Sequence, residues 1–239
     1  MENCFDFLRL CWESLLDIIF PAPSSCSACG RLLKEYNEVL LCPYCQEELN
    51  RLPGAYMEAS EFLSTGAHKE SISDGFDYIG APYLYEGSAR NMVRALKYKG
   101  RTYAARSMAQ LMSRELKKIG LKSDIIVPVP AYGEMEKKRG YNQAELIARE
   151  LSSIMGIPMR KALIKNRNTP SQVSLSEKER WENVRGAYAL EGNVKGLSIL
   201  LVDDVITTGA TMYFSSHQLK RGGALNVISF SFTMTLQNK

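Results

Sequence analysis

Apolar and polar positions recur with two different periods along residues 75–239, and together these periods predict an α/β domain. Helical spacing of apolar residues is found over residues 88–100, 103–120, 141–155 and 209–221. Short apolar runs typical of strands occupy residues 124–130, 159–165, 187–190, 197–202 and 224–233. Two aromatic runs within residues 76–87, broken at residues 80–82, predict a hairpin. Strands that alternate with helices favour a mostly parallel sheet flanked by helices, and such sheets bind ligands at the carboxyl ends of their strands.

The sequence ahead of this domain has a different character. Residues 1–20 carry apolar side chains at helical spacing, which predicts an amphipathic helix. No apolar run approaches the roughly 20 residues of a spanning helix, and the early charges of Glu2, Asp6 and Arg9 do not fit a signal peptide. We therefore expect a cytoplasmic protein without a membrane span. Its predicted parts are an N-terminal helix and cysteine module at 1–50, a linker at 51–74 and the α/β domain at 75–239.

Four of the six cysteines form two CxxC pairs, Cys26 with Cys29 and Cys42 with Cys45. Each CxxC turn can aim two thiolates at one tetrahedral metal, so the spacing predicts a Zn²⁺ site. A redox dithiol in one pair is the alternative, but the segment between the pairs is too short for the strand–helix–strand setting of such a motif. Four protein ligands leave no open position on the metal, so the expected role is structural.

The stretch ILLVDDVITTGAT, residues 199–211, carries the most chemical information. Its apolar start predicts an inner strand, which brings Asp203 and Asp204 to the point where the strand leaves the sheet. Hydroxyls and backbone N–H groups then follow at the start of a helix, where they can surround a phosphate: those of Thr207, Thr208, Gly209 and Thr211. Adjacent carboxylates can accept hydrogen bonds from vicinal hydroxyls. The stretch therefore predicts a sugar phosphate site.

Two other kinds of protein place acids at the end of such a strand. A nucleoside triphosphatase would need a GxxxxGK[ST] loop, and the chain contains none. A receiver domain would need most of its fold after the acid pair, whereas only 35 residues follow Asp204. A plain strand followed by a threonine-rich helix start accounts for the hydroxyls but not for the two acids.

The stretch VDDVITTGAT resembles the loop that binds phosphoribosyl pyrophosphate (PRPP) in type I phosphoribosyltransferases. Other stretches resemble the ComF family of competence-associated, phosphoribosyltransferase-like proteins, in particular its ComFC branch. They are the cysteine module, LKYKG at 96–100, VPVP with KRGYNQAELIA at 138–148, and RNTPSQVSLSEKERWENVRGAY at 167–188. The resemblance covers most of the chain. It implies a type I phosphoribosyltransferase fold and a role in uptake of single-stranded DNA, beside an ATP-driven DNA translocase.

The resemblance also implies roles for individual residues. Asp203 and Asp204 are expected to bind the ribose hydroxyls and to stabilise positive charge on the ribose during catalysis. Contacts to PRPP are expected from Val202, Thr207, Thr208, Gly209, Ala210 and Thr211. In the loop after VPVP, Lys138 and Arg139 would face the pyrophosphate, and Mg²⁺ would enter with PRPP. Some purine-specific relatives carry an acid where this chain has Thr207, so that acceptor class is disfavoured.

Residues 167–185 correspond to the mobile catalytic loop of the related enzymes. Ser176 and Glu179 form an S-x-x-E capping box, which predicts a short helix running to about Asn183.

Two classes of function remain open at this stage. The first is an enzyme that transfers the phosphoribosyl group of PRPP. The second is a DNA-uptake accessory protein that keeps a PRPP pocket and binds single-stranded DNA weakly, or a translocase partner. Cations and aromatic rings gather in one stretch that suits the second class, although a solvated helical face has the same composition: Arg94, Lys97, Tyr98, Lys99, Arg101, Tyr103 and Arg106.

Overall fold

The structure is a computed structural model, and it describes residues 25–49, 51, 56–58, 75–133, 140–169 and 177–235. No helix among these residues is long and apolar enough to cross a membrane. Several predictions fall outside the described residues: the N-terminal helix, the cations Lys138 and Arg139, and Ser176 of the capping box.

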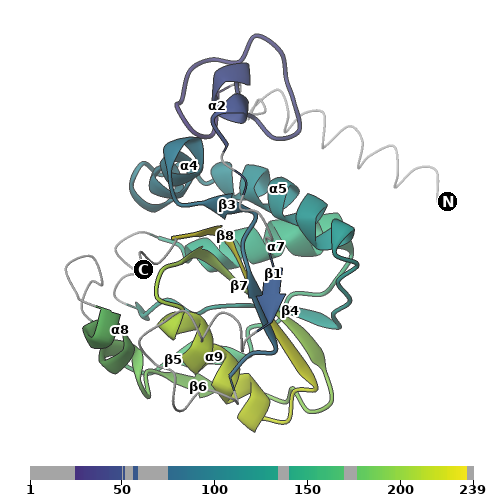
Figure 1. Ribbon diagram of the computed structural model, residues 1–239, viewed down its shortest axis with the longest axis vertical. Coiled ribbons are helices and arrows are strands. Elements are labelled where there is room, and N and C mark those ends of the chain that lie inside the picture. Colours follow the sequence, from purple (N-terminus) through teal and green to yellow (C-terminus); the bar gives the residue numbers. More distant parts are fainter. Residues whose placement is uncertain are drawn as a thin grey trace, which may run out of the picture.

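A mostly parallel sheet forms the centre of the fold, which confirms the predicted α/β class (Figure 1). Its strands lie in the order β1-β2-β8-β7-β4, and all are parallel to their neighbours except β1, which is antiparallel to β2. The inner strands β7 and β8 pair over most of their length. One strand, β1, lies inside the stretch that the sequence suggests as a linker. The bounds are β1 (Tyr56–Glu58), β2 (Tyr78–Gly80), β4 (Ile125–Pro128), β7 (Ser198–Ile206) and β8 (Asn226–Met234).

The predicted hairpin within residues 76–87 is wrong. β2 and β3 (Tyr83–Leu84) do not pair with each other, because both run parallel to β8 in one continuous register. They form a single strand line that is interrupted at Ala81 and Pro82. Proline has no N–H for the ladder, so a break at this point is expected. The aromatic residues do lie in two short strands, as their alternation predicts. This local pattern could not show that the partner strand of both is β8, at the far end of the chain.

Helices cover both faces of the sheet, as predicted (Figure 1). Three of them pack on one face, one packs on the other with a further helix packed on it, and consecutive side chains of β7 divide between the two cores. Leu200 and Val202 pack with the first group, whereas Ile199 and Leu201 pack with the second. The first group is α4 (Gly87–Tyr98), α5 (Ala104–Lys118) and α7 (Gln143–Met155), and the second is α8 (Glu177–Val184) and α9 (Ala210–Arg221).

The strands predicted at residues 159–165 and 187–190 do not extend the central sheet as full strands. β5 (Leu163–Lys165) and β6 (Tyr188–Leu190) pair only with each other, antiparallel, in a small second sheet. A single parallel bridge joins Met159 to Ile126 of β4. The predicted short helix exists as α8, and it ends one residue later than expected, at Val184. Trp181 of α8 packs on Tyr213 and Phe214 of α9.

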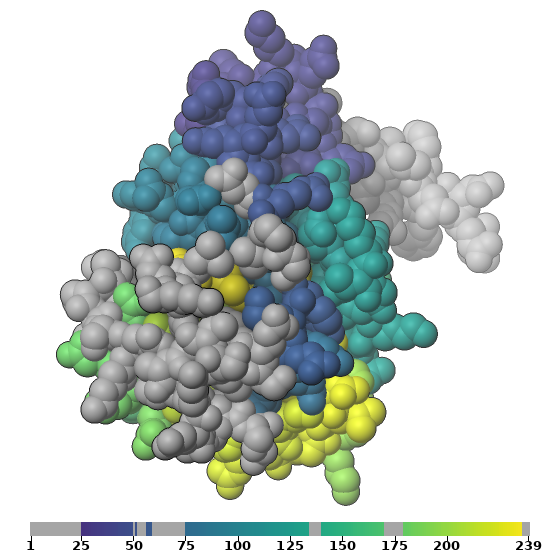
Figure 2. Space-filling view, viewed as in Figure 1, coloured from purple at the N-terminus to yellow at the C-terminus, as the bar shows by residue number. Residues whose placement is uncertain are grey.

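The cysteine module, residues 25–49, sits on α4 and α5 at one end of the molecule (Figures 1 and 2). It contains the short helix α2 (Pro43–Glu47). Hydrogen bonds of 2.6 Å between the hydroxyls of Ser27 and Ser107 and 2.5 Å from Ser88 to Glu48 fix the module on the two helices. Arg101 packs directly beneath Gly30, where a Cβ atom would lie 2.2 Å from its Nη2 atom. Arg101 therefore supports the module, which corrects its prediction as a DNA-facing cation.

Candidate functional site

The two predicted acids lie inside β7, which is longer than the sequence suggests. The strand continues to Ile206, and Asp203 is still in register with Ser231 of β8. The expectation that the acids stand beyond the strand end is therefore wrong, because β8 offers pairing partners as far as Met234. Consecutive strand residues point to opposite faces. Asp204 accordingly meets α4, while the charge of Asp203 acts on Lys165 of β5 and Tyr188 of β6.

Asp204 forms an ion pair with Lys97 from the last turn of α4. Oδ2 of Asp204 lies 2.8 Å from Nζ of Lys97, and the residue is only 4% exposed. Burial acts to lower the pKa of Lys97, but the charge of Asp204 and a hydrogen bond to it outweigh burial, and the pKa is raised. Lys97 is therefore charged and directed at the acid pair. This corrects the prediction that it belongs to a basic stretch for DNA.

Asp203 carries a carboxyl group that is difficult to ionise. Burial raises its pKa to about 7, and the charge of Asp204 adds to this effect, while Lys97, the backbone N–H of Asp204 and Lys165 act against it. That N–H donates to Oδ1 of Asp203 at 2.8 Å. Near neutral pH the carboxyl group of Asp203 therefore holds a proton part of the time, and a cationic group or a hydroxyl donor would favour its ionised form.

Lys165 and Tyr188 approach this carboxyl from the small sheet. Nζ of Lys165 donates to Oγ1 of Thr169 at 2.8 Å and lies 5.5 Å from the ring centroid of Tyr188. Burial lowers the pKa of Lys165, and the charge of Asp203 acts against this shift. Burial raises the pKa of the Tyr188 hydroxyl, Asp203 adds to it, and a hydrogen bond with the Thr211 side chain opposes it. The second sheet thus connects Asp203 to the start of α9.

The predicted phosphate-binding residues are brought together at the turn between β7 and α9. Gly209 has φ 79°, a left-handed conformation that favours glycine, and it is the N-cap of α9 without a side-chain cap. The first N–H groups of α9 therefore face a turn that also carries the side chains of Thr207 and Thr208. Thr235 donates to the carbonyl oxygen of Thr207 at 3.3 Å and ties the turn to the end of β8.

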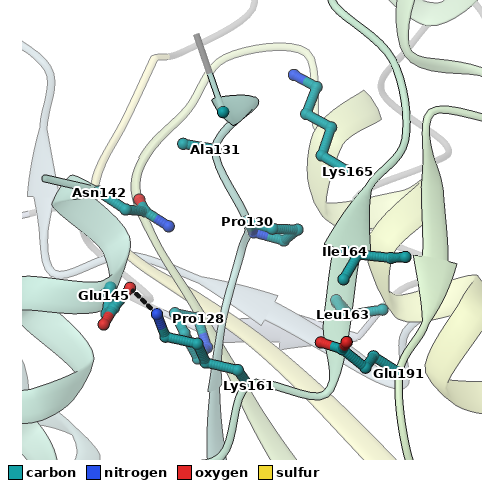
Figure 3. A pocket seen from close by; sticks show the side chains of 11 residues that line it. Pro128, Pro130, Ala131, Asn142, Glu145, Lys161, Leu163, Ile164, Lys165 and Glu191 are labelled. Carbon is teal, nitrogen blue, oxygen red and sulfur yellow. Dashed lines mark ion pairs between the residues drawn. The ribbon is translucent and has the colours of Figure 1, made fainter. Parts of the chain in front are cut away.

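A cavity of about 230 Å³ lies beside the site, between the end of β4, the start of α7 and β5 (Figure 3). Lys161 reaches Glu145 across it at 2.7 Å, and Arg149 also contacts Glu145 at 2.6 Å. Burial acts to raise the pKa of Glu145, but these two cations outweigh it and lower the pKa. Pro130, Ala131 and Gly133, at the start of the loop after β4, also line this cavity, together with Lys165.

The four cysteines gather as their spacing predicts. Their sulfur atoms all lie within 4.8 Å of one another, and those of Cys29 and Cys42 are 3.8 Å apart. A cluster of this size could hold one metal ion. Burial acts to raise the pKa of the Cys29 thiol, but hydrogen bonds from Arg31 outweigh it and lower the pKa to about 6. The backbone N–H of Cys42 points at the sulfur of Cys26, 3.4 Å away.

Comparisons with known proteins identify the domain and the family. Residues 101–233 match the model of the phosphoribosyl transferase domain. The chain is 30% identical over 198 residues to competence protein F of Haemophilus influenzae, covering 77% of this chain and 85% of that protein. It belongs to the ComF family and carries a phosphoribosyl transferase domain.

Two further relatives extend the match. The DNA utilization protein YhgH of Salmonella typhimurium is 29% identical over 235 residues, which cover 95% of this chain and 97% of that protein. Competence protein ComFC of Bacillus subtilis is 29% identical over 154 residues, covering 62% of this chain and 61% of that protein. The similarity to YhgH thus includes the cysteine module as well as the phosphoribosyl transferase domain.

Sequence reasoning missed three groups around the acids of the phosphoribosyl transferase domain. Lys165 lies on a short strand without a motif, and Tyr188 stands at the end of a stretch, 167–188, that was noticed for its resemblance to the ComF family and not as a neighbour of the acid pair. Lys97 was noticed as part of LKYKG and as one cation of a basic stretch, but not as a partner of the acids. A signal was nevertheless present for Lys97, because it stands in the last turn of an amphipathic helix, close to apolar positions that face the sheet.

The raised pKa of Asp203 predicts an unusual effect of its removal. An acid whose pKa is raised from 3.8 to about 7 gives the folded state more bound protons between these values, so stability falls as the pH rises through that window. Asp203→Asn should therefore raise the free energy of unfolding at pH 8 by on the order of 2 kcal/mol and leave it unchanged near pH 3. One pKa unit corresponds to about 1.4 kcal/mol, and we take about half of the full shift because the two acids titrate together. Urea unfolding at several pH values measures this, with the exposed Glu35→Gln as control. Equal pH dependence of wild type and Asp203→Asn would contradict the assignment.

Proposed function

We propose that the protein binds PRPP with Mg²⁺ at the carboxyl edge of β7 and serves the uptake and use of DNA. The observation that carries the proposal is the succession of an acid pair, a left-handed glycine turn and a helix start without a side-chain cap. Free N–H groups at a helix start favour an anion, and the adjacent threonines add hydroxyl donors. The match to the phosphoribosyl transferase domain supports this reading, since it spans the whole region.

Each part of PRPP has a proposed partner. The 5′-phosphate is assigned to Thr207, Thr208, Gly209, Ala210 and Thr211, which form the turn and first residues of α9. The ribose hydroxyls are assigned to Asp203 and Asp204, which follow the fully buried Val202 in β7. The pyrophosphate is assigned to the loop after β4, with Lys138 and Arg139 as counter-charges. Mg²⁺ bound to the diphosphate would neutralise charge on this leaving group.

A transferase at this site would move the phosphoribosyl group from PRPP to an acceptor. The acceptor nucleophile forms a bond to C1 of the ribose, the bond from C1 to the pyrophosphate oxygen breaks, and that oxygen keeps the electron pair. The acceptor proton passes to solvent. Positive charge develops at C1 and the ring oxygen, and the ionised acids of β7 would stabilise it. Thr207 stands where some purine-specific relatives have an acid, which argues against a purine acceptor.

A second candidate function is an accessory role in which the protein holds DNA or a translocase without transferring a group. Arg94, Lys99 and Arg106 are exposed on α4 and α5, and Tyr98 is 65% exposed beside them. Cations with an aromatic ring suit the backbone and bases of single-stranded DNA. The names of the relatives, competence protein and DNA utilization protein, support the same biology. We assign the protein to the cytoplasm, where an ATP-driven translocase partner would connect it to the membrane uptake machinery.

We further propose that the cysteine cluster holds Zn²⁺. A tetrahedral site with Zn–S bonds of about 2.3 Å has sulfur atoms about 3.8 Å apart, and Cys29 and Cys42 show 3.8 Å. Four sulfur donors favour zinc over magnesium or calcium, which prefer oxygen. Arg31 within the module and Arg101 beside it would offset part of the negative charge of four thiolates.

Zinc content tests the cysteine cluster directly. Protein purified without added metal should contain about one zinc per chain, and Cys26→Ser or Cys45→Ser should lose the metal and unfold the module, because metal-coupled folding contributes on the order of 10 kcal/mol. Elemental analysis with circular dichroism measures both effects. Cys11→Ser, at a cysteine that belongs to neither CxxC pair, should keep its zinc. A metal-free protein with a disulfide between Cys26 and Cys29 would contradict the proposal.

Thermal unfolding tests the PRPP site. PRPP with Mg²⁺ at about 100 times its dissociation constant should stabilise the protein by about 2.7 kcal/mol, a rise in Tm of about 5 to 10 °C for a chain of this size. The double variant Asp203→Asn, Asp204→Asn should remain folded and lose this rise. Ribose 5-phosphate and pyrophosphate, tested separately, identify which half of the ligand binds. No rise with any of the three compounds would overturn the PRPP site.

Single-stranded DNA binding tests the second function. The double variant Arg94→Ala, Lys99→Ala should bind an oligonucleotide about three- to tenfold more weakly, with a smaller salt dependence, because each phosphate contact contributes about 0.7 to the salt slope. Lys117→Ala with Lys122→Ala, two exposed cations elsewhere on the chain, is the matched control. Equal loss in both double variants would mean that binding follows net charge alone.

Complementation in a naturally competent host then separates the two functions. If the PRPP site is needed, the Asp203→Asn, Asp204→Asn variant fails to restore transformation at a normal protein level, whereas the Arg94→Ala, Lys99→Ala variant restores it at least in part. The reverse result would favour the accessory role.

A further inference from the structure

The ion pair between Lys97 and Asp204 is the closest charge contact at the acid pair. Nζ of Lys97 lies 2.8 Å from Oδ2 of Asp204, with the two side chains 25% and 6% exposed. Apart from Lys97, this oxygen has no hydrogen-bond partner within the part of the chain that the structure describes. Asp203 and Tyr85 are the other titratable groups whose charge acts on Lys97. The ammonium group of Lys97 thus occupies the position at which a bound metal cation would otherwise contact the carboxylate of Asp204.

The helix that supplies Lys97 is fixed at both ends. At its first turn, the hydroxyl of Ser88 donates to Glu48 of the cysteine module at 2.5 Å. At its last turn, the hydroxyl of Tyr141 donates to the carbonyl oxygen of Leu96 at 2.6 Å. Leu96, which precedes Lys97, is fully buried. The ammonium is therefore held in place by the fold and does not depend on a mobile surface side chain.

The positive charge of Lys97 determines how the acid pair interacts with cations. Two consecutive carboxylates near the carboxyl end of the inner strand β7 offer oxygen ligands of the kind that Mg²⁺ and Mn²⁺ prefer. With Lys97 in contact, the group of three side chains carries one negative charge less, and one carboxylate oxygen is already occupied. A divalent cation approaching the free protein would meet the ammonium at short range, where the repulsion between like charges is strong.

We propose that Lys97 is a positioning residue that holds the side chain of Asp204 in place and keeps divalent cations off the acid pair of the free protein. This inference rests on the proposed PRPP site, and it assigns the metal to the ligand: Mg²⁺ reaches the site as a complex with the diphosphate. Asp204 then acts through its orientation and its charge, while Asp203 is the acid of the pair that lies outside this ion pair.

Manganese binding to the zinc-loaded protein, without any sugar phosphate, tests the proposal. Mn²⁺ serves as the probe because electron paramagnetic resonance counts the free ion. Lys97→Met should bind Mn²⁺ at least about tenfold more tightly than wild type, because one short-range positive charge is removed. Lys97→Arg should behave as wild type, which a merely structural role of the lysine side chain would not predict. Lys99→Met, an exposed neighbour on the same helix end, is the matched control.

The double variant Lys97→Met, Asp204→Asn checks that the gained site includes Asp204, and its Mn²⁺ affinity should return to the wild-type level. Lys97→Gln replaces Lys97→Met should the latter fail to fold. Unchanged Mn²⁺ affinity in folded Lys97→Met or Lys97→Gln would overturn the proposal, and so would tight Mn²⁺ binding by the wild type. Because the titration contains no PRPP, its outcome is independent of the thermal shift with PRPP, and the two proposals can fail separately.

Discussion

The burial of β7 is the constraint on which the rest of the site depends. Ile199 to Val202 are fully buried between β4 and β8, and the same strand then carries two consecutive carboxylates. Ionised acids in such a place are costly unless cations or hydrogen-bond donors reach them. The strand sends them to opposite faces, and the charge of Lys97 acts on both. Asp204 forms the ion pair with Lys97 of α4. Burial keeps the pKa of Asp203 high, although Lys97, the backbone N–H of Asp204 and Lys165 of β5 act against it.

The parts of the fold that could be predicted are those with a local signal. Periodicity located α4, α5, α7 and α9 and the strands β4, β7 and β8, since each of these elements buries one face or one run of its own residues. The failures all depend on partners far away in the chain. Tyr78–Gly80 and Tyr83–Leu84 alternate as a hairpin would, but β8 competes for both. The end of β7 likewise depends on how far β8 extends beside it.

The candidate site likewise has a part that the sequence could predict and a part that it could not. The acids of β7, the threonines and Gly209 are neighbours in sequence, so the pattern alone could bring them together around one ligand. Lys97, Lys165 and Tyr188 come from three other elements, and only the tertiary packing shows that they surround the acids. Composition even pointed the wrong way for Lys97 and Arg101. Both stand in a basic stretch, yet one turns to Asp204 and the other packs beneath Gly30.

Helix α4 connects the cysteine module to the acid pair, because it contacts both. The module is bonded to the first turn of α4 through Glu48 and Ser88 and to α5 through Ser27 and Ser107. Lys97 leaves the other end of α4, so a shift of the module that rotates or tilts this helix also moves the ammonium. The small module thus contacts the first turn of the same helix whose last turn supplies Lys97 to the acid pair.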